Sequence, residues 1–195
     1  MLYILTLFET FGITQYVVCR EKTTCPNISY NVIRSPHPHQ TLDNLVCKCL
    51  VPPGYDKTIV YCCSWEETEL MAKRLNLPFC HSSMPLSKIN TMLDLLYAGQ
   101  ARTMVSTTVL RAALDLCDLK WVFHLDHPYD MISYIQESGH VGRNLNMPTF
   151  PNVIIPQHTY PTKKILSVQN ILLHQFVIQN RNCNIALAVD SSQSI

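Results

Sequence analysis

The feature that most constrains this chain is its alternation of short β-rich runs with runs of helical period. Between about residues 57 and 143, runs rich in β-branched and aromatic residues alternate with runs whose apolar residues recur at helical spacing. Such alternation is typical of βα units on a parallel sheet. The predicted strands are Thr58–Cys63, Pro78–His81, Arg102–Ser106 and Trp121–Leu125. We therefore predict an α/β protein with a doubly wound parallel sheet flanked by helices.

Capping signals place the helices between these strands. Ser64 and Glu67 have the spacing of a capping box, which predicts a helix that begins at Ser64. A second helix is predicted over residues 85–99 and a third over residues 130–139, each bounded by residues that favour helix ends. The flanks are less regular: we predict strands at 16–19, 28–33 and 153–155, helix-like stretches at 42–50 and 163–179, a turn-rich joint at 35–39 and a linker at 146–151.

Composition predicts a globular chain with a substantial core. Of the 195 residues, 47% are hydrophobic and 15% are charged, so there is ample apolar surface to bury. The formal net charge is +1, so no strong basic field indicates nucleic acid, and a nucleic-acid role would have to come from local sites. The apolar start, residues 1–8, is too short to span a bilayer and lacks a basic flank, so we expect no membrane partner.

The most informative polar stretch is Gln136–Arg143, in which Gly139 and Gly142 follow a predicted helix and lead to an arginine. Glycines let the backbone pass close to a partner, and a guanidinium matches phosphate oxygens. Taken alone, the stretch is more typical of an exposed helix end with an ordinary surface arginine. Its context favours a site, because Ser106 and Thr107 end one predicted strand and Asp115 follows. Loops at the carboxyl ends of parallel strands share one edge, where ligands bind, so we expect these side chains to converge there.

Three strings resemble motifs IV, V and VI of RecQ-type superfamily 2 DNA helicases, in the same order. They are Thr58–Ser64, Val105–Asp115 and Gln136–Arg143. The stretch HLDHPYDMISYIQESGHVGRN, residues 124–144, also resembles the fungal RecQ-like proteins associated with telomere-linked helicase genes. The resemblance covers roughly residues 14–147. It implies a single RecA-like lobe of the P-loop NTPase type at 27–147, a residual interlobe segment at 1–26 and an irregular extension at 148–195.

The resemblance also implies roles for the matching positions. The whole protein would be an ATP-dependent 3′–5′ DNA helicase of the nucleus, acting on single-stranded DNA or a duplex junction. Arg143 would be the arginine finger that stabilises charge on the transferring phosphoryl group, and Asp115 would approach the ribose. The other contributors to the ATP site would be Gln136, Gly139, His140 and Gly142. The residues facing the DNA backbone would be Ser64, His81, Ser82, Ser106 and Thr107.

Departures from the family pattern predict limited activity. His140 stands where motif VI has an arginine, and Arg111 and Ala113 stand where motif V has glycines. No phosphate loop of the form G-x-x-x-x-G-K-[ST] and no Asp-Glu pair occur in these 195 residues. We therefore expect ATP and Mg²⁺ to bind only together with an ATP-binding RecA-like lobe, and no hydrolysis by these residues alone. The alternative is a non-catalytic nucleic-acid-binding or interaction module, or a decayed helicase remnant.

Cysteine and histidine spacing predicts no metal site. The nine cysteines include no C-x-x-C pair, and several lie within apolar runs, so we expect reduced, mostly buried thiols of an intracellular protein. His124 and His127 with Cys117 nearby, or Cys47 with Cys49, are the conceivable ligands. A histidine at the end of a buried strand is more often hydrogen-bonded in the core or at its rim. A metalloprotein would require stoichiometric zinc in the purified chain.

Overall fold

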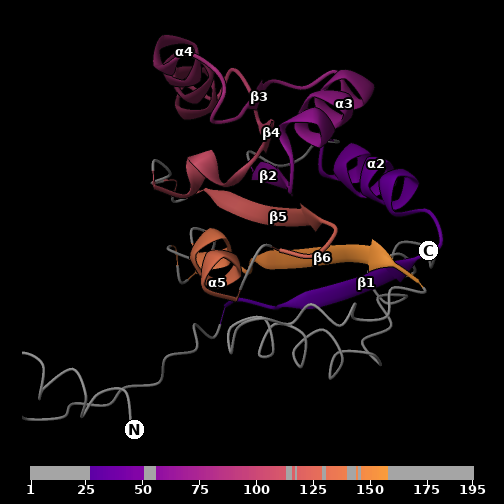
Figure 1. Cartoon of the computed structure of the whole chain (residues 1–195). Coiled ribbons are helices and arrows are strands. Elements are labelled where there is room, and N and C mark those ends of the chain that lie inside the picture. The colour runs from indigo at the N-terminus through magenta and orange to yellow at the C-terminus, as the bar shows by residue number, and fades with distance from the viewer. Residues whose placement is uncertain are drawn as a thin grey trace, which may run out of the picture.

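The computed structural model describes residues 27–50, 56–112, 116, 118–128, 131–139, 144 and 146–157. Within these ranges six strands form one sheet, in which every neighbouring pair is parallel and the order is β1-β6-β5-β2-β4-β3 (Figure 1). The strands are β1 (Asn31–Ser35), β2 (Lys57–Cys62), β3 (Phe79–Cys80), β4 (Thr103–Ser106), β5 (Leu119–Leu125) and β6 (Phe150–Pro156). The predicted α/β class with a parallel sheet is confirmed.

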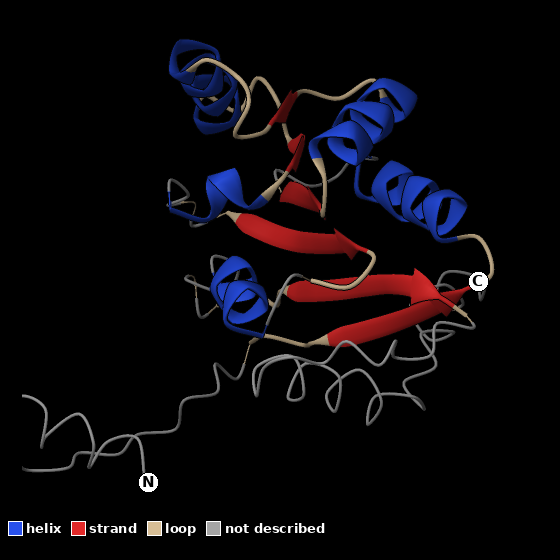
Figure 2. Ribbon diagram, viewed as in Figure 1, coloured by secondary structure: helices blue, strands red, loops and turns tan. Residues whose placement is uncertain are grey.

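Helices cover both faces of this sheet (Figure 2). They are α2 (Pro38–Leu50), α3 (Trp65–Leu75), α4 (Leu86–Tyr97) and α5 (Met131–Gly139), with a short 3₁₀ helix η1 (Thr108–Ala112). Side chains alternate along β2, so Val60 packs with α2 and α3 on one face, while Ile59 packs with α4 and η1 on the other. Tyr134 of α5 packs against β1 and β6 on one face of the sheet. Ile154 of β6 points to the other face, where it packs with α2 and α3. No described helix is long and apolar enough to cross a membrane.

The predicted cap of α3 is confirmed. The Ser64 hydroxyl accepts a hydrogen bond from the Glu67 backbone N–H at 3.2 Å, which satisfies one of the free donors at the helix start. The Glu67 carboxylate contacts the His39 Nε2 at 2.6 Å, so it links α3 to α2. The turn that closes α4 is also as predicted, because Gly99 follows the helix with φ of +71°, a conformation that glycine adopts without a steric penalty.

The flanks differ in detail from the predicted pattern. β1 begins at Asn31 rather than at residue 28, and Ile28 forms only an isolated bridge with Thr149. α2 begins at Pro38, inside the predicted turn-rich joint, since proline suits the first turn of a helix. β6 lies between β1 and β5, so the sheet extends past residue 147, where the sequence placed the end of the lobe. The elements predicted at 16–19 and 163–179, and the capping residue Asp130, lie outside the described residues.

Candidate nucleic-acid and nucleotide edge

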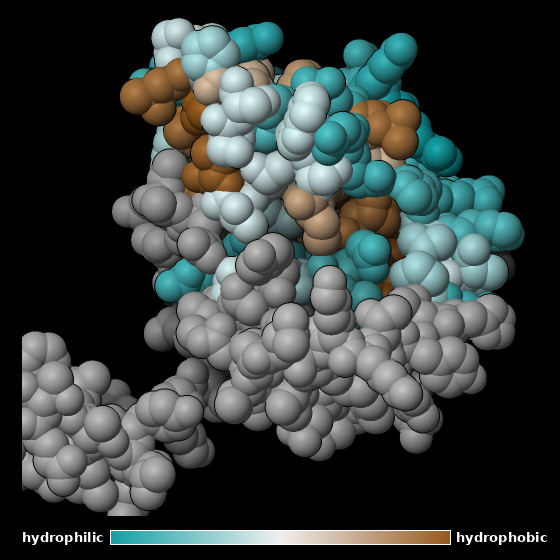
Figure 3. Space-filling view, in the orientation of Figure 1, coloured by the Kyte–Doolittle hydropathy of each residue, from teal (hydrophilic) through white to brown (hydrophobic). Residues whose placement is uncertain are grey.

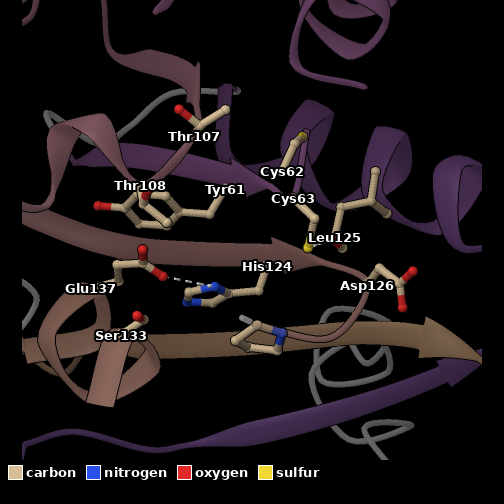
Figure 4. Close-up of a pocket in the computed structure, with 11 residues that line it drawn as sticks. Tyr61, Cys62, Cys63, Thr107, Thr108, His124, Leu125, Asp126, Ser133 and Glu137 are labelled. Atoms are coloured by element: carbon tan, nitrogen blue, oxygen red, sulfur yellow. Dashed lines mark hydrogen bonds and ion pairs between the residues drawn. The ribbon is translucent and has the colours of Figure 1, made fainter. Parts of the chain in front are cut away.

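The carboxyl edge of the sheet holds a crevice between β2 and its two neighbours. After β2 the chain passes to the face covered by α2 and α3, whereas after β4 and β5 it passes to the face covered by η1 and α5. Loops that diverge in this way open a crevice, which is where ligands bind in doubly wound sheets. A pocket of about 400 Å³ lies there, with its described lining drawn from the ends of β2, β4 and β5 and from α5 (Figure 4).

A buried histidine and a buried glutamate meet at this pocket. The Nδ1 atom of His124, on β5, lies 3.5 Å from Oε2 of Glu137, on α5, and each side chain is only 3% exposed. The imidazole stacks on Tyr61 with ring centroids 5.2 Å apart and meets the ring of Tyr134 edge-on at 5.0 Å. Burial lowers the pKa of His124 to about 3, because the charged form would lose its hydration. The ring is therefore neutral at pH 7, so its 3.5 Å contact with Glu137 is not an attraction between opposite charges.

The turn from β5 to α5 is held by several backbone contacts. Asp126 has φ of +70°, which is strained for a residue with a side chain, and strain of this kind gathers at functional sites. Its carboxylate accepts a hydrogen bond from the His127 N–H at 2.8 Å, and its own N–H donates to the Ile154 carbonyl at 2.8 Å. From β2, the Cys63 thiol donates to the His127 carbonyl at 3.0 Å.

Cys63 therefore serves as a donor and not as a nucleophile. Loss of hydration, together with the nearby carboxylates of Asp126, Glu137 and Glu67, raises the pKa of its thiol to about 11. A thiol with such a pKa stays protonated at neutral pH, and only a thiolate attacks or binds metal. The pocket consequently offers neutral hydrogen-bonding groups and carboxylates rather than a reactive sulfur.

Hydroxyl-bearing side chains follow three adjacent strands at this edge. Ser64 comes shortly after β2, Thr107 directly after β4 and Ser82 shortly after β3, and the strand order β2-β4-β3 makes these ends neighbours. Ser82 is exposed, and Ser64 and Thr107 are half-buried. These three predicted DNA-facing residues therefore lie along one edge, on strands spaced about 4.8 Å apart.

The other two predicted DNA-facing residues point inward. Ser106 is fully buried, and its hydroxyl donates within the sheet, with the carbonyls of Cys80 at 3.0 Å and Thr107 at 2.8 Å in reach. His81 is 3% exposed, with Ser83 Oγ at 2.8 Å from its Nδ1 and Glu69 at 3.1 Å from its Nε2. Any contact of these two with DNA would involve their backbone, and it stays a prediction.

The structure brings only part of the predicted ATP site into view. Gln136 and Gly139 are exposed on α5, next to the inward-facing Glu137. The remaining predicted contributors lie outside the described residues: Asp115, His140, Gly142 and Arg143. Among its described lining residues the pocket has carboxylates but no lysine or arginine, so this lining does not fit a triphosphate. The part of the chain that the structure describes also holds no group of three or more metal-ligating side chains, and Cys117 lies outside it.

Comparison with known proteins decides the family. The family model described as the helicase conserved C-terminal domain matches residues 41–145, which is more than half of the chain and includes all three predicted motifs. The chain belongs to this family. The match of this helicase C-terminal domain includes the three motifs on which the resemblance to RecQ-type helicases depends. The curated relatives of the chain confirm that resemblance.

Two relatives illustrate the likeness of this helicase domain to RecQ-type proteins. It is 23% identical over 124 residues to the ATP-dependent DNA helicase RecQ of Pasteurella multocida, covering 61% of this chain and 19% of that protein. It is 31% identical over 91 residues to the ATP-dependent DNA helicase Q-like 5 of Arabidopsis thaliana, covering 44% of this chain and 10% of that protein. The helicase domain thus spans no more than about a fifth of the length of these two relatives.

A solved structure confirms the fold. The helicase Lhr of Mycobacterium smegmatis, bound to single-stranded DNA and AMP-PNP, matches with a TM-score of 0.59 and 17% identity, over 85% of this chain and 23% of that one. At this identity the match establishes a shared lobe architecture and nothing finer. Related helicases bind nucleic acid, which makes the edge lined by hydroxyl groups the part of this helicase domain to examine for that role.

Proposed function

We propose that this domain is the C-terminal lobe of an ATP-dependent 3′–5′ DNA helicase and that it binds the backbone of a single DNA strand along its carboxyl edge. The observation that carries the proposal is the row of Ser64, Thr107 and Ser82 at the ends of three adjacent parallel strands. Hydroxyl groups and backbone N–H groups bind phosphate oxygens without reading sequence, as a translocating lobe requires. The DNA-bound structure of the helicase Lhr supports the choice of ligand.

DNA binding is tested by titrating the chain with a single-stranded oligonucleotide at several salt concentrations. We expect affinity to fall only shallowly as salt rises, because hydroxyl groups bind phosphates without neutralising them and so release few counterions. Ser82→Ala and Thr107→Val each remove one hydroxyl, so each should weaken binding by about 2- to 10-fold, the value of one hydrogen bond. Ser29→Ala is the matched control, because Ser29 is an exposed serine that precedes β1 at the opposite edge of the sheet. Equal losses in all three variants would contradict the proposed edge.

We further propose that these residues do not hydrolyse ATP by themselves. The sequence holds no phosphate loop, and the described lining of the pocket offers no cation to a triphosphate. ATP and Mg²⁺ would be held between this lobe and an ATP-binding lobe. From this lobe, the residues that contribute to the ATP site would be Arg143, Asp115 and Gln136. When bound, the nucleotide would supply the phosphoryl transfer that drives translocation, while residues of this lobe would position its ribose and phosphates.

An ATPase measurement on the purified chain with single-stranded DNA tests this second part. We expect no turnover above background. Arg143→Ala distinguishes contamination from activity, because a contaminating ATPase is unaffected by the substitution. Turnover that disappears in Arg143→Ala would show that the chain is catalytically complete and would overturn the proposal.

The substitution of His140 for the arginine of the family pattern favours a second candidate, a lobe that binds DNA without supporting catalysis. The measurement that separates the two candidates is ATPase activity after an ATP-binding RecA-like lobe of a RecQ-type helicase is supplied. The non-catalytic module would be favoured if the reconstituted pair binds DNA but does not hydrolyse ATP, and if His140→Arg restores ATP hydrolysis.

A further inference from the structure

Trp65 is an exposed aromatic residue at the edge assigned to DNA. It is 52% exposed, although tryptophan is a residue that proteins usually cover, and it directly follows Ser64 at the start of α3. The spacing of Trp65 with Thr68 and Ala72, both buried, would place it on the inner face of the helix. Because α3 begins shortly after β2 ends, its first turn lies at the rim of the sheet, and the indole reaches solvent there.

The indole is braced by the side chains around it. Its ring lies 6.1 Å from the ring of His81 at an interplanar angle of 47°, and His81 in turn stacks on Phe79 at 5.7 Å and 19°. The contacts of His81 with Ser83 and Glu69 fix that imidazole at both nitrogens. A ring held in this way loses little conformational freedom when a ligand packs on it, so it is pre-organised for stacking.

The surroundings of Trp65 suit a nucleobase better than an apolar protein surface. Its sequence neighbours Ser64 and Glu66 are polar. The surface over α2 and α3 is largely hydrophilic with scattered apolar side chains, among them Leu70 of α3 at 56% exposed, and further apolar side chains gather near α4 (Figure 3). The core of a protein–protein interface needs a contiguous apolar patch, which these neighbours do not provide. A single strand of nucleic acid instead offers a flat base to the ring and phosphates to the adjoining hydroxyl groups.

Two of the acidic residues in the first turns of α3 contact histidine side chains. Glu67 contacts His39 at 2.6 Å and Glu69 contacts His81 at 3.1 Å. These contacts hold both carboxylates toward histidines of α2 and of the segment after β3. These contacts orient the two carboxylates without removing their charge, so the aromatic ring and the hydroxyl groups are what this edge offers a DNA strand.

We infer that Trp65 stacks on a base of the single strand bound along the carboxyl edge. The inference rests on the proposed DNA-binding function and adds the residue that selects unpaired strands. Stacking on one aromatic ring strengthens binding of a single strand by roughly 5- to 150-fold and tolerates any base. Duplex DNA gains nothing from the ring, because its bases are already stacked on each other.

The experiment compares Trp65→Ala and Trp65→Phe with the unsubstituted chain for binding to single-stranded oligo(dT) and to a duplex of equal length. Trp65→Ala should lose about 5- to 150-fold in affinity for the single strand and little for the duplex. Trp65→Phe should retain part of the affinity, because it keeps a ring. The salt dependence should be the same in all variants, because no phosphate contact is removed. Urea unfolding confirms that each variant remains folded.

Fluorescence gives a direct readout of the same contact. The chain has two tryptophans, and Trp121 is covered by Phe150 with ring centroids 4.6 Å apart. The Trp121→Phe variant leaves Trp65 as the sole reporter, and oligo(dT) should quench it at the concentrations at which binding is measured. The inference is overturned if Trp65→Ala binds DNA as well as the unsubstituted chain does and if DNA does not quench Trp65 in the Trp121→Phe variant. That result leaves the proposed function intact. Failure of every variant to bind DNA refutes the proposed function itself.

Discussion

Acidification should destabilise this domain through His124. The side chain is 3% exposed, packs between the rings of Tyr61 and Tyr134, and has its pKa lowered to about 3 by burial. In the unfolded chain the imidazole has its ordinary pKa of 6.5 and takes up a proton below that value. Between about pH 6.5 and pH 3 the unfolded state therefore binds more protons than the folded state. The free energy of unfolding must fall as pH falls through this window, and it is unaffected by His124 above it.

The size of the effect follows from the two pKa values. The largest slope is about 1.4 kcal/mol per pH unit, so lowering the pH from 7.5 to 5 should cost about 2 kcal/mol through this one side chain. That loss is a substantial part of the roughly 5–15 kcal/mol that stabilises a typical domain.

The assay is urea unfolding at a series of pH values between 7.5 and 5. The unsubstituted chain should lose stability as pH falls, and His124→Gln, which cannot take up a proton, should lose about 2 kcal/mol less over the same interval. His37→Gln is the matched control, because it makes the same change of side chain at an exposed position outside the pocket. An NMR titration of the unsubstituted chain should show a His124 ring that stays neutral at pH 5. Identical pH slopes in the unsubstituted chain and His124→Gln, or a ring that is protonated at pH 5, would refute this reasoning.

Three further predictions concern stability and reactivity. Ser64→Ala removes the cap of α3 and should cost about 1 kcal/mol in urea unfolding; an unchanged midpoint would mean that the hydrogen bond to Glu67 contributes nothing. Phe123→Ala removes a side chain that is 1% exposed and should lower the free energy of unfolding by about 3–5 kcal/mol. Leu86→Ala changes a side chain that is 71% exposed and should lower it by less than about 0.5 kcal/mol. Similar losses in the two variants would contradict the assigned core. Cys63 has a thiol pKa of about 11, so iodoacetamide at pH 8 should alkylate it on the order of 100-fold more slowly than a thiol of pKa 9. Peptide mass spectrometry follows the alkylation. Rapid labelling would show that the thiol does not hold the β5–α5 turn.

The fold was largely predictable because local signals and the global pattern agree. Buried central strands such as β2 are continuous apolar runs, and the cap at Ser64 and the glycine after α4 mark helix ends by stereochemistry alone. The predicted strand at 153–155 is confirmed within β6, but the first residues of β6 were assigned to a linker, because Phe150 and Pro151 follow a proline-containing segment. Register explains the exception: β1 pairs with β6 only from Asn152 onward, so Pro151 lies where β6 has β5 as its one neighbour in the sheet.

The candidate site was predictable in position but not in the direction of each side chain. The rule that loops of parallel strands share an edge predicted that Thr107 lies there, and the resemblance to RecQ-type helicases added Ser64 and Ser82. It could not show that Ser106, the last residue of β4, points into the sheet, since that depends on register and on the carbonyl of Cys80. Glu137 was missed as a buried residue because a glutamate within a polar stretch predicts exposure. Only the packing of α5 on β5 places it against His124.

The position of β6 has a consequence for how the chain folds. β1 pairs with β6, so Asn31 meets a partner that lies more than a hundred residues later in the sequence. Contacts of such separation form slowly, because the entropy of closing a long loop must be lost before the pairing gives any return. β1, the first described strand, should therefore be among the last to join the sheet. Until then β6 presents an unpaired edge, which is where a nascent or damaged molecule is most open to pairing with another chain.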